Sequence, residues 1–199
     1  MALDVNHYNA LFLHSPGQND ATKYGVTISP CERGPDVTIY RCIGIHHLTP
    51  EENAGNHNAY FDVLDEQGHR IPQAAIEWTW QGRQLHEPAP PAVIDKPDTE
   101  PGTNIAMSWA QTISASVLGH PTDTVLNIHT RHPDEGHSGG NTRGHHSFYV
   151  VFQRYTPGQE TPPTDPNCEQ HLLRIAQLDA TLDVTMIKLK EIIQMIEDA

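Results

Sequence analysis

The clearest pattern in the chain lies between residues 37 and 155, where apolar and polar side chains alternate over short stretches separated by turn residues. Alternation with a period of two is typical of β-strands that bury one face, because successive side chains point to opposite sides. No helical period of apolar residues is evident before residue 168. We therefore predict a mainly β domain at 37–155, an antiparallel β-sandwich of the immunoglobulin-like or jelly-roll type. The strands are expected near 37–45, 59–63, 70–71, 76–80, 105–117, 125–129 and 145–155.

Two stretches carry more specific expectations. In the first strand Ile43 and Ile45 fall on one face, opposite Cys42 and Gly44. The alternation over 105–117 is long for one strand, and such strands usually bend or pass from one sheet to another. Ahead of the domain, residues 1–36 read as an N-terminal arm, in which the apolar run 8–13 is expected to pair as an edge strand or to lie across a neighbour.

A second pattern, with a period of seven, occupies residues 168–199 and predicts a coiled-coil helix of about four heptads. A single amphipathic helix of this length is marginal in water, so the pattern implies a partner, and its a and d choices favour a parallel homotrimer. The alternative is that the helix folds back onto its own domain. Residues 156–167 hold four prolines and predict an extended linker. The a and d positions are Ile175, Leu178, Leu182, Thr185, Leu189, Ile192 and Ile196.

The net charge of the chain limits which classes of molecule it can bind. The 199 residues carry a net charge of -13, which repels phosphate backbones and anionic lipids and argues against nucleic acid as a partner. No apolar run is long enough for membrane insertion, and residues 1–7 do not resemble a signal peptide, so localisation stays open between association with a virion and release by lysis. Cys31, Cys42 and Cys168 show no CxxC spacing, which leaves free thiols or one bridge between Cys31 and Cys42.

Histidine is the most unusual feature of the composition, with 14 residues. His129, His132 and His137 fall within nine residues together with two carboxylates, and imidazole and carboxylate are ligands for divalent zinc, nickel or copper. The sequence thus predicts that these three histidines form a metal site. The alternative is a polar loop whose histidines titrate near neutral pH. Of the adjacent pair at 46–47, His47 is expected to close the end of the core and His46 to face outward.

A surface for a polar ligand is predicted on the outward faces of the strands. Tyr60 and Tyr149 occupy non-core positions, and Asp62 and His145 lie near them in sequence. Trp80 is the aromatic candidate, because sugars stack their apolar faces on aromatic rings. The three tryptophans share their strand faces with aliphatic residues, however, so at least two are expected to pack in the core.

Motifs of catalysis are not found: there is no GxSxG, HExxH, P-loop or GxGxxG pattern. No cofactor is expected beyond the divalent metal considered above. The sequence therefore predicts a protein that is not an enzyme, with a metal-dependent hydrolase using the 129–137 loop as the alternative.

Three runs resemble an accessory β-sandwich module, of the carbohydrate-binding kind that accompanies cell-wall hydrolases of bacteria and phages: YRCIGIHHLTPEEN at 40–53, IEWTWQGR at 76–83 and GHHSFYVVFQ at 144–153. The resemblance covers 37–155 and implies attachment to a surface polysaccharide or cell-wall glycan. It departs from those modules because a coiled coil, and not a hydrolase domain, is attached. We therefore expect a homotrimer of glycan-binding heads, in which linkage makes weak sites avid. A purely structural virion or assembly protein is the alternative.

Overall fold

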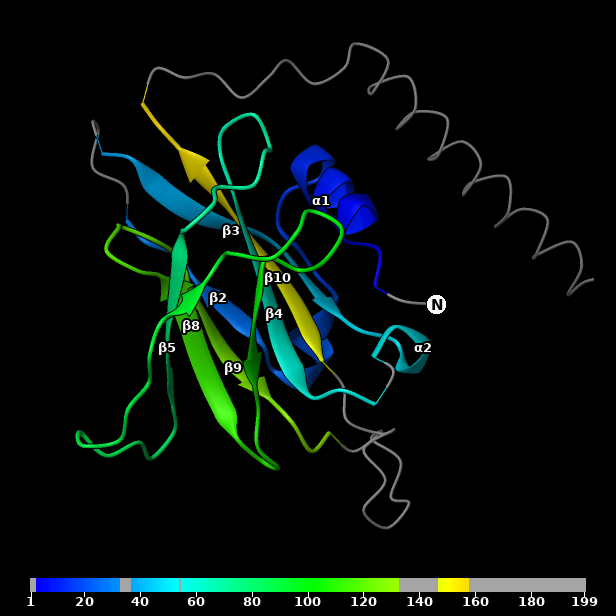
Figure 1. The fold of residues 1–199 in the computed structure, drawn as a ribbon, viewed down its shortest axis with the longest axis vertical. Coiled ribbons are helices and arrows are strands. Elements are labelled where there is room, and N and C mark those ends of the chain that lie inside the picture. Colours follow the sequence, from blue (N-terminus) through cyan, green and yellow to red (C-terminus); the bar gives the residue numbers. More distant parts are fainter. Residues whose placement is uncertain (1–2, 33–36, 54, 133–146, 158–199) are drawn as a thin grey trace, which may run out of the picture. The chain divides into compact units, whose positions relative to one another are not determined.

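The computed structural model describes residues 3–32, 37–53, 55–132 and 147–157, which form two five-stranded β-sheets packed as a sandwich (Figure 1). The first sheet has the order β1 (Gln18–Asn19), β3 (Ile39–His47), β10 (Phe148–Tyr155), β4 (Asn58–Leu64) and β7 (Thr103–Ala106). The second has the order β2 (Thr27–Ser29), β9 (Thr124–His129), β8 (Thr112–Val117), β5 (Ala75–Trp80) and β6 (Ala92–Val93). The helices within these ranges are α1 (Val5–His14), the 3₁₀ helix η1 (Asp20–Tyr24) and α2 (Pro50–Asn53). The mainly β sandwich is thus confirmed.

The first sheet is mixed, so the expectation of a wholly antiparallel sandwich was wrong. β10 lies between β3 and β4 and runs antiparallel to β3 but parallel to β4, while β1 also pairs with β3 in parallel. β3 and β4 follow each other in sequence and run in opposite directions, so a strand inserted between them is parallel to one of the two. Alternation along a strand reports its faces and carries no information on direction.

The long alternating stretch at 105–117 is divided between the sheets, as expected from its length. Its first part forms β7 in the first sheet and its second part forms β8 in the other. The chain crosses between them through residues 107–111, where Ala110 has a left-handed backbone with φ +58°. The short return strand expected at 70–71 is reduced to one bridge between Leu64 and Arg70.

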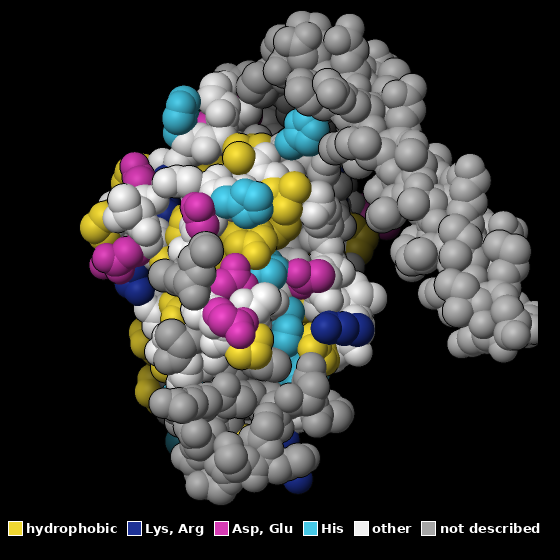
Figure 2. Space-filling model, turned by 90° about the vertical axis from the view of Figure 1, so that its right-hand side faces the viewer, with side chains coloured by type: hydrophobic (Ala, Val, Ile, Leu, Met, Phe, Trp, Pro, Cys, Tyr) yellow, Lys and Arg dark blue, Asp and Glu magenta, His cyan; other side chains and the backbone are white. Residues whose placement is uncertain are grey.

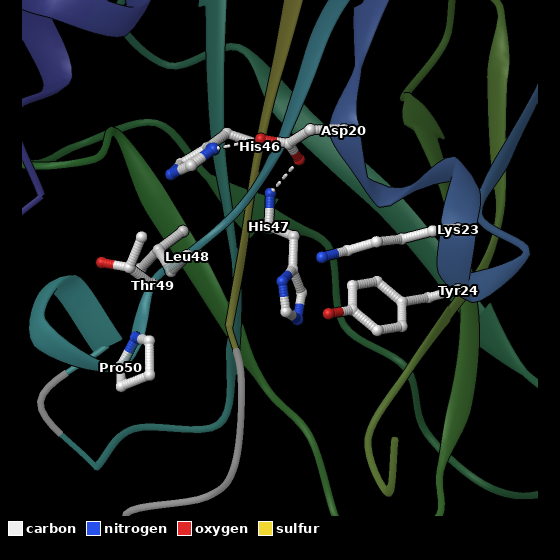
Figure 3. Close-up of a pocket in the computed structure, with 8 residues that line it drawn as sticks. All are labelled: Asp20, Lys23, Tyr24, His46, His47, Leu48, Thr49 and Pro50. Atoms are coloured by element: carbon white, nitrogen blue, oxygen red, sulfur yellow. Dashed lines mark hydrogen bonds and ion pairs between the residues drawn. The ribbon is translucent and has the colours of Figure 1, made fainter. Parts of the chain in front are cut away.

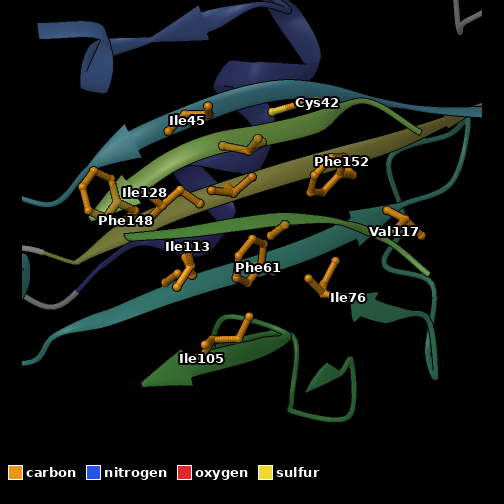
Figure 4. Packing of buried hydrophobic residues seen from close by; sticks show 14 of the residues in the cluster. Cys42, Ile45, Phe61, Ile76, Ile105, Ile113, Val117, Ile128, Phe148 and Phe152 are labelled. Carbon is orange, nitrogen blue, oxygen red and sulfur yellow. The ribbon is translucent and has the colours of Figure 1, made fainter. Parts of the chain in front are cut away.

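The core between the sheets is built from the inward positions of the strands, as Figure 4 shows for Phe61, Ile113 and Phe148. Each of these side chains is fully buried, and such burial contributes about 1.5–3 kcal/mol per large apolar residue.

The register of β3 against β10 shifts at Val151, which leaves Ile43 as an extra residue in β3. This bulge reverses the alternation, so Ile43 faces away from the core that contains Cys42 and Ile45, against the expectation that both isoleucines share a face.

The apolar run at 8–13 is helical, so the predicted edge strand was wrong. Asp4 caps α1 by accepting a hydrogen bond from the backbone N–H of His7. The helix buries Val5 and Phe12 in a second apolar cluster with Ile43, Tyr149 and Val151, over the outer face of the first sheet. A six-residue apolar run spans less than two helical turns, which is too short to display the helical period.

One glycine makes this packing possible. A Cβ added to Gly44 in β3 would lie 2.1 Å from Cγ of Phe12, so the ring occupies the space that any larger residue would fill. With α1 in place, β10 is buried on both faces from Phe148 to Gln153. Two further parts of the predicted arm belong to the sandwich, since β1 pairs with β3 and β2 pairs with β9.

The predicted coiled coil at 168–199, with all of its a and d positions, lies outside the described residues, as does most of the linker at 156–167. Over the described ranges, no helix is long and apolar enough to span a membrane. Cys31 and Cys42 are both free thiols, and Cys42 is buried. The alternative of a bridge between them is therefore not realised.

Candidate ligand-binding site

A pocket of about 410 Å³ opens where β3 ends and faces η1 (Figure 3). Its walls are the end of β3 with the residues that follow it and, opposite, the 3₁₀ helix. Figure 2 shows one face of the molecule, where histidine side chains gather among acidic and apolar ones. The residues that line the pocket are Asp20, Lys23, Tyr24, His46, His47, Leu48, Thr49 and Pro50.

Asp20 fastens η1 to β3. Its Oδ1 accepts a hydrogen bond of 2.6 Å from the backbone N–H of His47, and its Oδ2 lies 2.6 Å from Nδ1 of His46. Asn19 caps the start of η1, and Gly25 ends it in a left-handed conformation with φ +81°, which few other residues adopt without strain. The pocket wall that carries Lys23 and Tyr24 is therefore fixed by a short sequence signal, Asn–x₅–Gly.

His46 is held between two carboxylates. In addition to Asp20, Oε2 of Glu52 lies 3.0 Å from its Nε2, and the ring of Tyr8 from α1 stacks on the imidazole at 4.0 Å. Tyr8 also donates a hydrogen bond of 2.9 Å to Glu52. His46 faces away from the main core, as predicted, yet it is buried, because α1 and α2 cover it.

The charges of this group follow from these bonds. Burial by itself lowers the pKa of His46, but the hydrogen bonds to Asp20 and Glu52 outweigh it and raise the pKa above its ordinary value. Burial raises the pKa of Glu52, whereas its bonds from His46, Thr49 and Tyr8 lower it to about 2. Burial and the bond to Glu52 raise the pKa of Tyr8. Both ring nitrogens of His46 are thus engaged by carboxylates, which favours its protonated form and leaves neither nitrogen available as a base.

His47 points inward and closes the end of the core, as predicted. Its ring lies 5.2 Å from that of Phe148 and 4.2 Å from that of Tyr24. Tyr24 is half-buried, and Nζ of Lys23 lies 4.7 Å from the centre of the Tyr24 ring. The pocket therefore combines an aromatic face with an ammonium, a phenol, an imidazole and a carboxylate.

Two of the three predicted metal ligands stack on each other. The rings of His129 and His132 are parallel to within 5° at 4.4 Å, and each ring bonds to a backbone oxygen, that of Asn127 for His129 and that of His129 for His132. Lone pairs lie in the plane of an imidazole, so parallel stacked rings do not direct them at one ion. His137 lies outside the described residues, among which no group of three His, Cys, Asp or Glu side chains is arranged to hold a metal.

The predicted ligand surface on the first sheet is covered. Tyr149 and Asp62 face outward as expected, but both are completely buried, with Asn9 of α1 in contact with each, so the expectation that they are open to a ligand was wrong. The hydroxyl of Tyr149 lies 2.5 Å from Oδ2 of Asp62, and burial raises its pKa. Tyr60 stays half-buried and accepts a hydrogen bond from Asn58. His145 lies outside the described residues.

The tryptophans divide as the sequence suggested, two against the core and one outside it. Trp78 and Trp80 are half-buried, pack against the core cluster, and have ring centres 5.3 Å apart. The guanidinium of Arg83 lies over Trp80 at 5.4 Å. Trp109 is 61% exposed. Trp80 is therefore still a candidate for ligand binding, but on the second sheet and not among the residues that line the pocket.

Sequence reasoning missed the residues that η1 and α2 bring to the pocket. One signal for α2 was present: Thr49 and Glu52 form a capping box, in which the Thr49 N–H donates to Glu52 and the Glu52 N–H donates to the Thr49 hydroxyl. That motif places the Glu52 carboxylate at the end of β3, next to His46. Comparisons of the chain with family models, with curated proteins and with solved structures give no match. Any inference about its function therefore rests on the geometry of this site.

Proposed function

We propose that the β-sandwich is a non-enzymatic binding module that recognises a surface polysaccharide or cell-wall glycan in the pocket beside Tyr24. The observation that carries the proposal is the composition of this pocket, in which the Tyr24 ring is surrounded by groups that donate and accept hydrogen bonds. Its volume of about 410 Å³ lies within the range of small-molecule sites and accommodates one sugar unit of a longer chain.

A sugar ring suits these groups because it has an apolar face and a rim of hydroxyls. The Tyr24 ring is half-buried, with Lys23 and His47 against it, and its exposed part offers an aromatic surface to that face. Asp20 offers acceptors for the hydroxyls: its side chain is 55% exposed, and each oxygen keeps lone-pair capacity beyond its bond to β3. The resemblance of the runs at 40–53, 76–83 and 144–153 to accessory modules supports the same class of ligand.

The heptad pattern at 168–199 supports display of several heads together. A pocket of this size gives weak binding to one sugar, and joining three copies through a coiled coil makes the second and third contacts intramolecular. We therefore propose a homotrimer. A chain that ends at Asn167 should keep single-site affinity and lose avidity on an immobilised glycan, which light scattering and surface binding together measure.

The test of the site is a glycan-array and cell-wall pull-down experiment with full-length protein. Tyr24→Ala should lower binding about tenfold, equivalent to the ~1.4 kcal/mol expected from one aromatic contact. Trp80→Ala is the competing variant, and Leu85→Ala, whose side chain is fully exposed at 105%, is the control. Circular dichroism verifies that each variant is folded.

Loss of binding in Trp80→Ala with full binding in Tyr24→Ala would move the site to the second sheet. Stable trimers that bind no glycan on the array or in cell walls would overturn the proposal. That result would favour the alternative of a structural virion or assembly protein.

A further inference from the structure

His46 of β3 joins two of the elements around the pocket to the end of the first sheet. Its Nδ1 lies 2.6 Å from Oδ2 of Asp20 on η1, and its Nε2 lies 3.0 Å from Oε2 of Glu52 on α2. Asp20 also accepts a hydrogen bond from the backbone N–H of His47, so this carboxylate lies between η1 and β3, as Figure 3 shows. The same short helix carries Tyr24. The position of the aromatic wall therefore depends in part on the contact between Asp20 and His46.

The two contacts of His46 together require a proton on both ring nitrogens. A neutral imidazole has one N–H and one lone pair, so it donates a hydrogen bond to only one of two carboxylates, whereas an imidazolium donates to both. Loss of the proton sets a carboxylate oxygen against a nitrogen lone pair, and two acceptors repel each other. One of the two contacts would then break.

Asp20 is the partner that would give way. The side chain of Glu52 is only 13% exposed, and it accepts further hydrogen bonds from the backbone N–H and the hydroxyl of Thr49. The side chain of Asp20 is 55% exposed, and in the described part of the chain its one other hydrogen bond comes from the backbone N–H of His47. A neutral His46 would therefore keep its N–H toward Glu52. Asp20 would turn toward solvent, which loosens η1 from β3.

The charges around His46 favour the protonated ring. Burial lowers the pKa of His46, but the hydrogen bonds to Asp20 and Glu52 outweigh burial and raise it. Lys23 is the one lysine or arginine among the residues that line the pocket. The titratable and charged groups that surround the ring are Asp4, His7 and Tyr8 at the start of α1, Asp20, Lys23 and Tyr24 of η1, His47 of β3, Glu51 and Glu52 of α2, and Tyr149 of β10.

We propose that the proton on His46 controls the pocket: the charged ring holds η1, with Tyr24, against β3, and the neutral ring releases it. The proposal rests on the proposed glycan function for the identity of the ligand, and it adds a regulation of that site by pH. β1 stays paired with β3, and Gly25 follows η1 with φ +81°, so the movement is confined to the residues between them. The glycan should bind about tenfold more tightly when His46 is charged than when it is neutral, a coupling typical of two linked equilibria.

The experiment follows the wall directly by NMR in the full-length protein from pH 5 to 10. The readout is the nuclear Overhauser effect between the rings of Tyr24 and His47, whose centres lie 4.2 Å apart. In wild type it should weaken with the same midpoint as the titration of the His46 ring. His46→Gln has no proton to lose, and Asp20→Asn can bond to either charge state of the ring, so each variant should remove this transition.

A control and a binding measurement complete the test. His69 also lies beside a carboxylate, 3.6 Å from that of Asp65, but it is 80% exposed and outside the pocket, so His69→Gln should keep the transition. Binding to purified bacterial cell walls is compared well below and well above the measured midpoint of His46. Wild type should lose about tenfold in affinity across it, and His46→Gln should show no such change.

The remaining outcomes separate the control by His46 from the glycan function. Three results overturn the control and leave the glycan function standing: a constant ring contact while His46 titrates, a His46 ring that keeps one charge from pH 5 to 10, and a glycan affinity that does not change with pH. A pH effect that survives in Asp20→Asn, or that His69→Gln also removes, overturns the control too, even if His46→Gln does not fold. A ring contact that follows His46 without glycan binding at any pH retains the control and overturns the glycan function.

Discussion

Removal of the Asp62 carboxylate should be among the most damaging single changes in the described part of the chain. Asp62 is fully buried, and Nη2 of Arg70 donates to its Oδ2 at 2.9 Å. Nε of Arg70 lies 2.7 Å from Oδ1, close enough for the charges to interact although its N–H is poorly aligned for a hydrogen bond. The backbone N–H of Gly102 also donates to Oδ1, and Asn9 of α1 donates to Oδ2.

The magnitude follows from what Asp62→Ala leaves behind. The Arg70 side chain is only 8% exposed, so its guanidinium would remain buried without its main counter-charge. Removal of one partner of a buried pair costs about 3–5 kcal/mol. Domains are stable by about 5–15 kcal/mol in total, so the variant should lose a large part of its unfolding free energy. Arg70 also donates to the backbone oxygens of Lys96, Pro97 and Glu100, and that loop should loosen as well.

The assay is urea unfolding followed by fluorescence and circular dichroism, with Asp98→Ala as the matched control. Asp98 contacts the same arginine at 3.4 Å, but its side chain is 87% exposed, so its removal should cost less than about 1 kcal/mol. Asp62→Ala combined with Arg70→Met should recover part of the loss, because both charges are then absent. A cost below about 1 kcal/mol for Asp62→Ala, or equal costs for the two aspartates, would refute the reasoning.

Two further predictions concern the contacts of α1. Gly44→Ala should destabilise the protein by about 1–3 kcal/mol, because its Cβ would lie 2.1 Å from the Phe12 ring; the cost should largely vanish in a Phe12→Ala background, which a double-mutant cycle of urea unfolding measures, and additive costs would contradict the contact. His46 should make stability depend on pH: its folded pKa is raised above the ordinary 6.5, so its contribution is fully present below pH 6.5 and is lost as pH rises through the folded pKa. Unfolding midpoints of wild type and His46→Gln should therefore converge toward alkaline pH, and a constant gap from pH 6 to 9 would sink the idea.

The sequence was sufficient for the strands that alternate cleanly and insufficient where a second layer buries the outer face. β5 and β9 were located within a few residues, because their outer faces are largely polar. β10 is buried on both faces. Its sequence pattern therefore predicted a strand, but it did not predict which strands lie beside it. Ile43 and Val151 are apolar residues on the outer face of the first sheet, and another element must bury them. Only with that requirement known do the apolar positions of α1 indicate a helix.

The site was less accessible than the fold for a different reason. Its residues come from three separate elements and a connecting segment, and the spacing between Asp20 and His46 in sequence carries no sign that they touch. The prediction from strand parity that Tyr149 and Asp62 face outward was correct, but parity does not report whether a helix lies on that face. Asp62, a buried carboxylate at an outward position, pairs with Arg70 eight residues later. Such a pair is consistent with an outer face that another part of the chain covers.

The covering of the first sheet also limits where a ligand can bind. Because α1 occupies its outer face and the second sheet occupies its inner face, the side chains of this sheet reach solvent mainly where its strands end. β3 ends at His46 and His47, and there the imidazole of His46 joins η1 through Asp20 and α2 through Glu52 while it stacks on Tyr8 of α1. The helix that closes the face therefore also stabilises the wall of the pocket. Changes in α1 should consequently affect ligand binding as well as stability, although none of its residues lines the pocket.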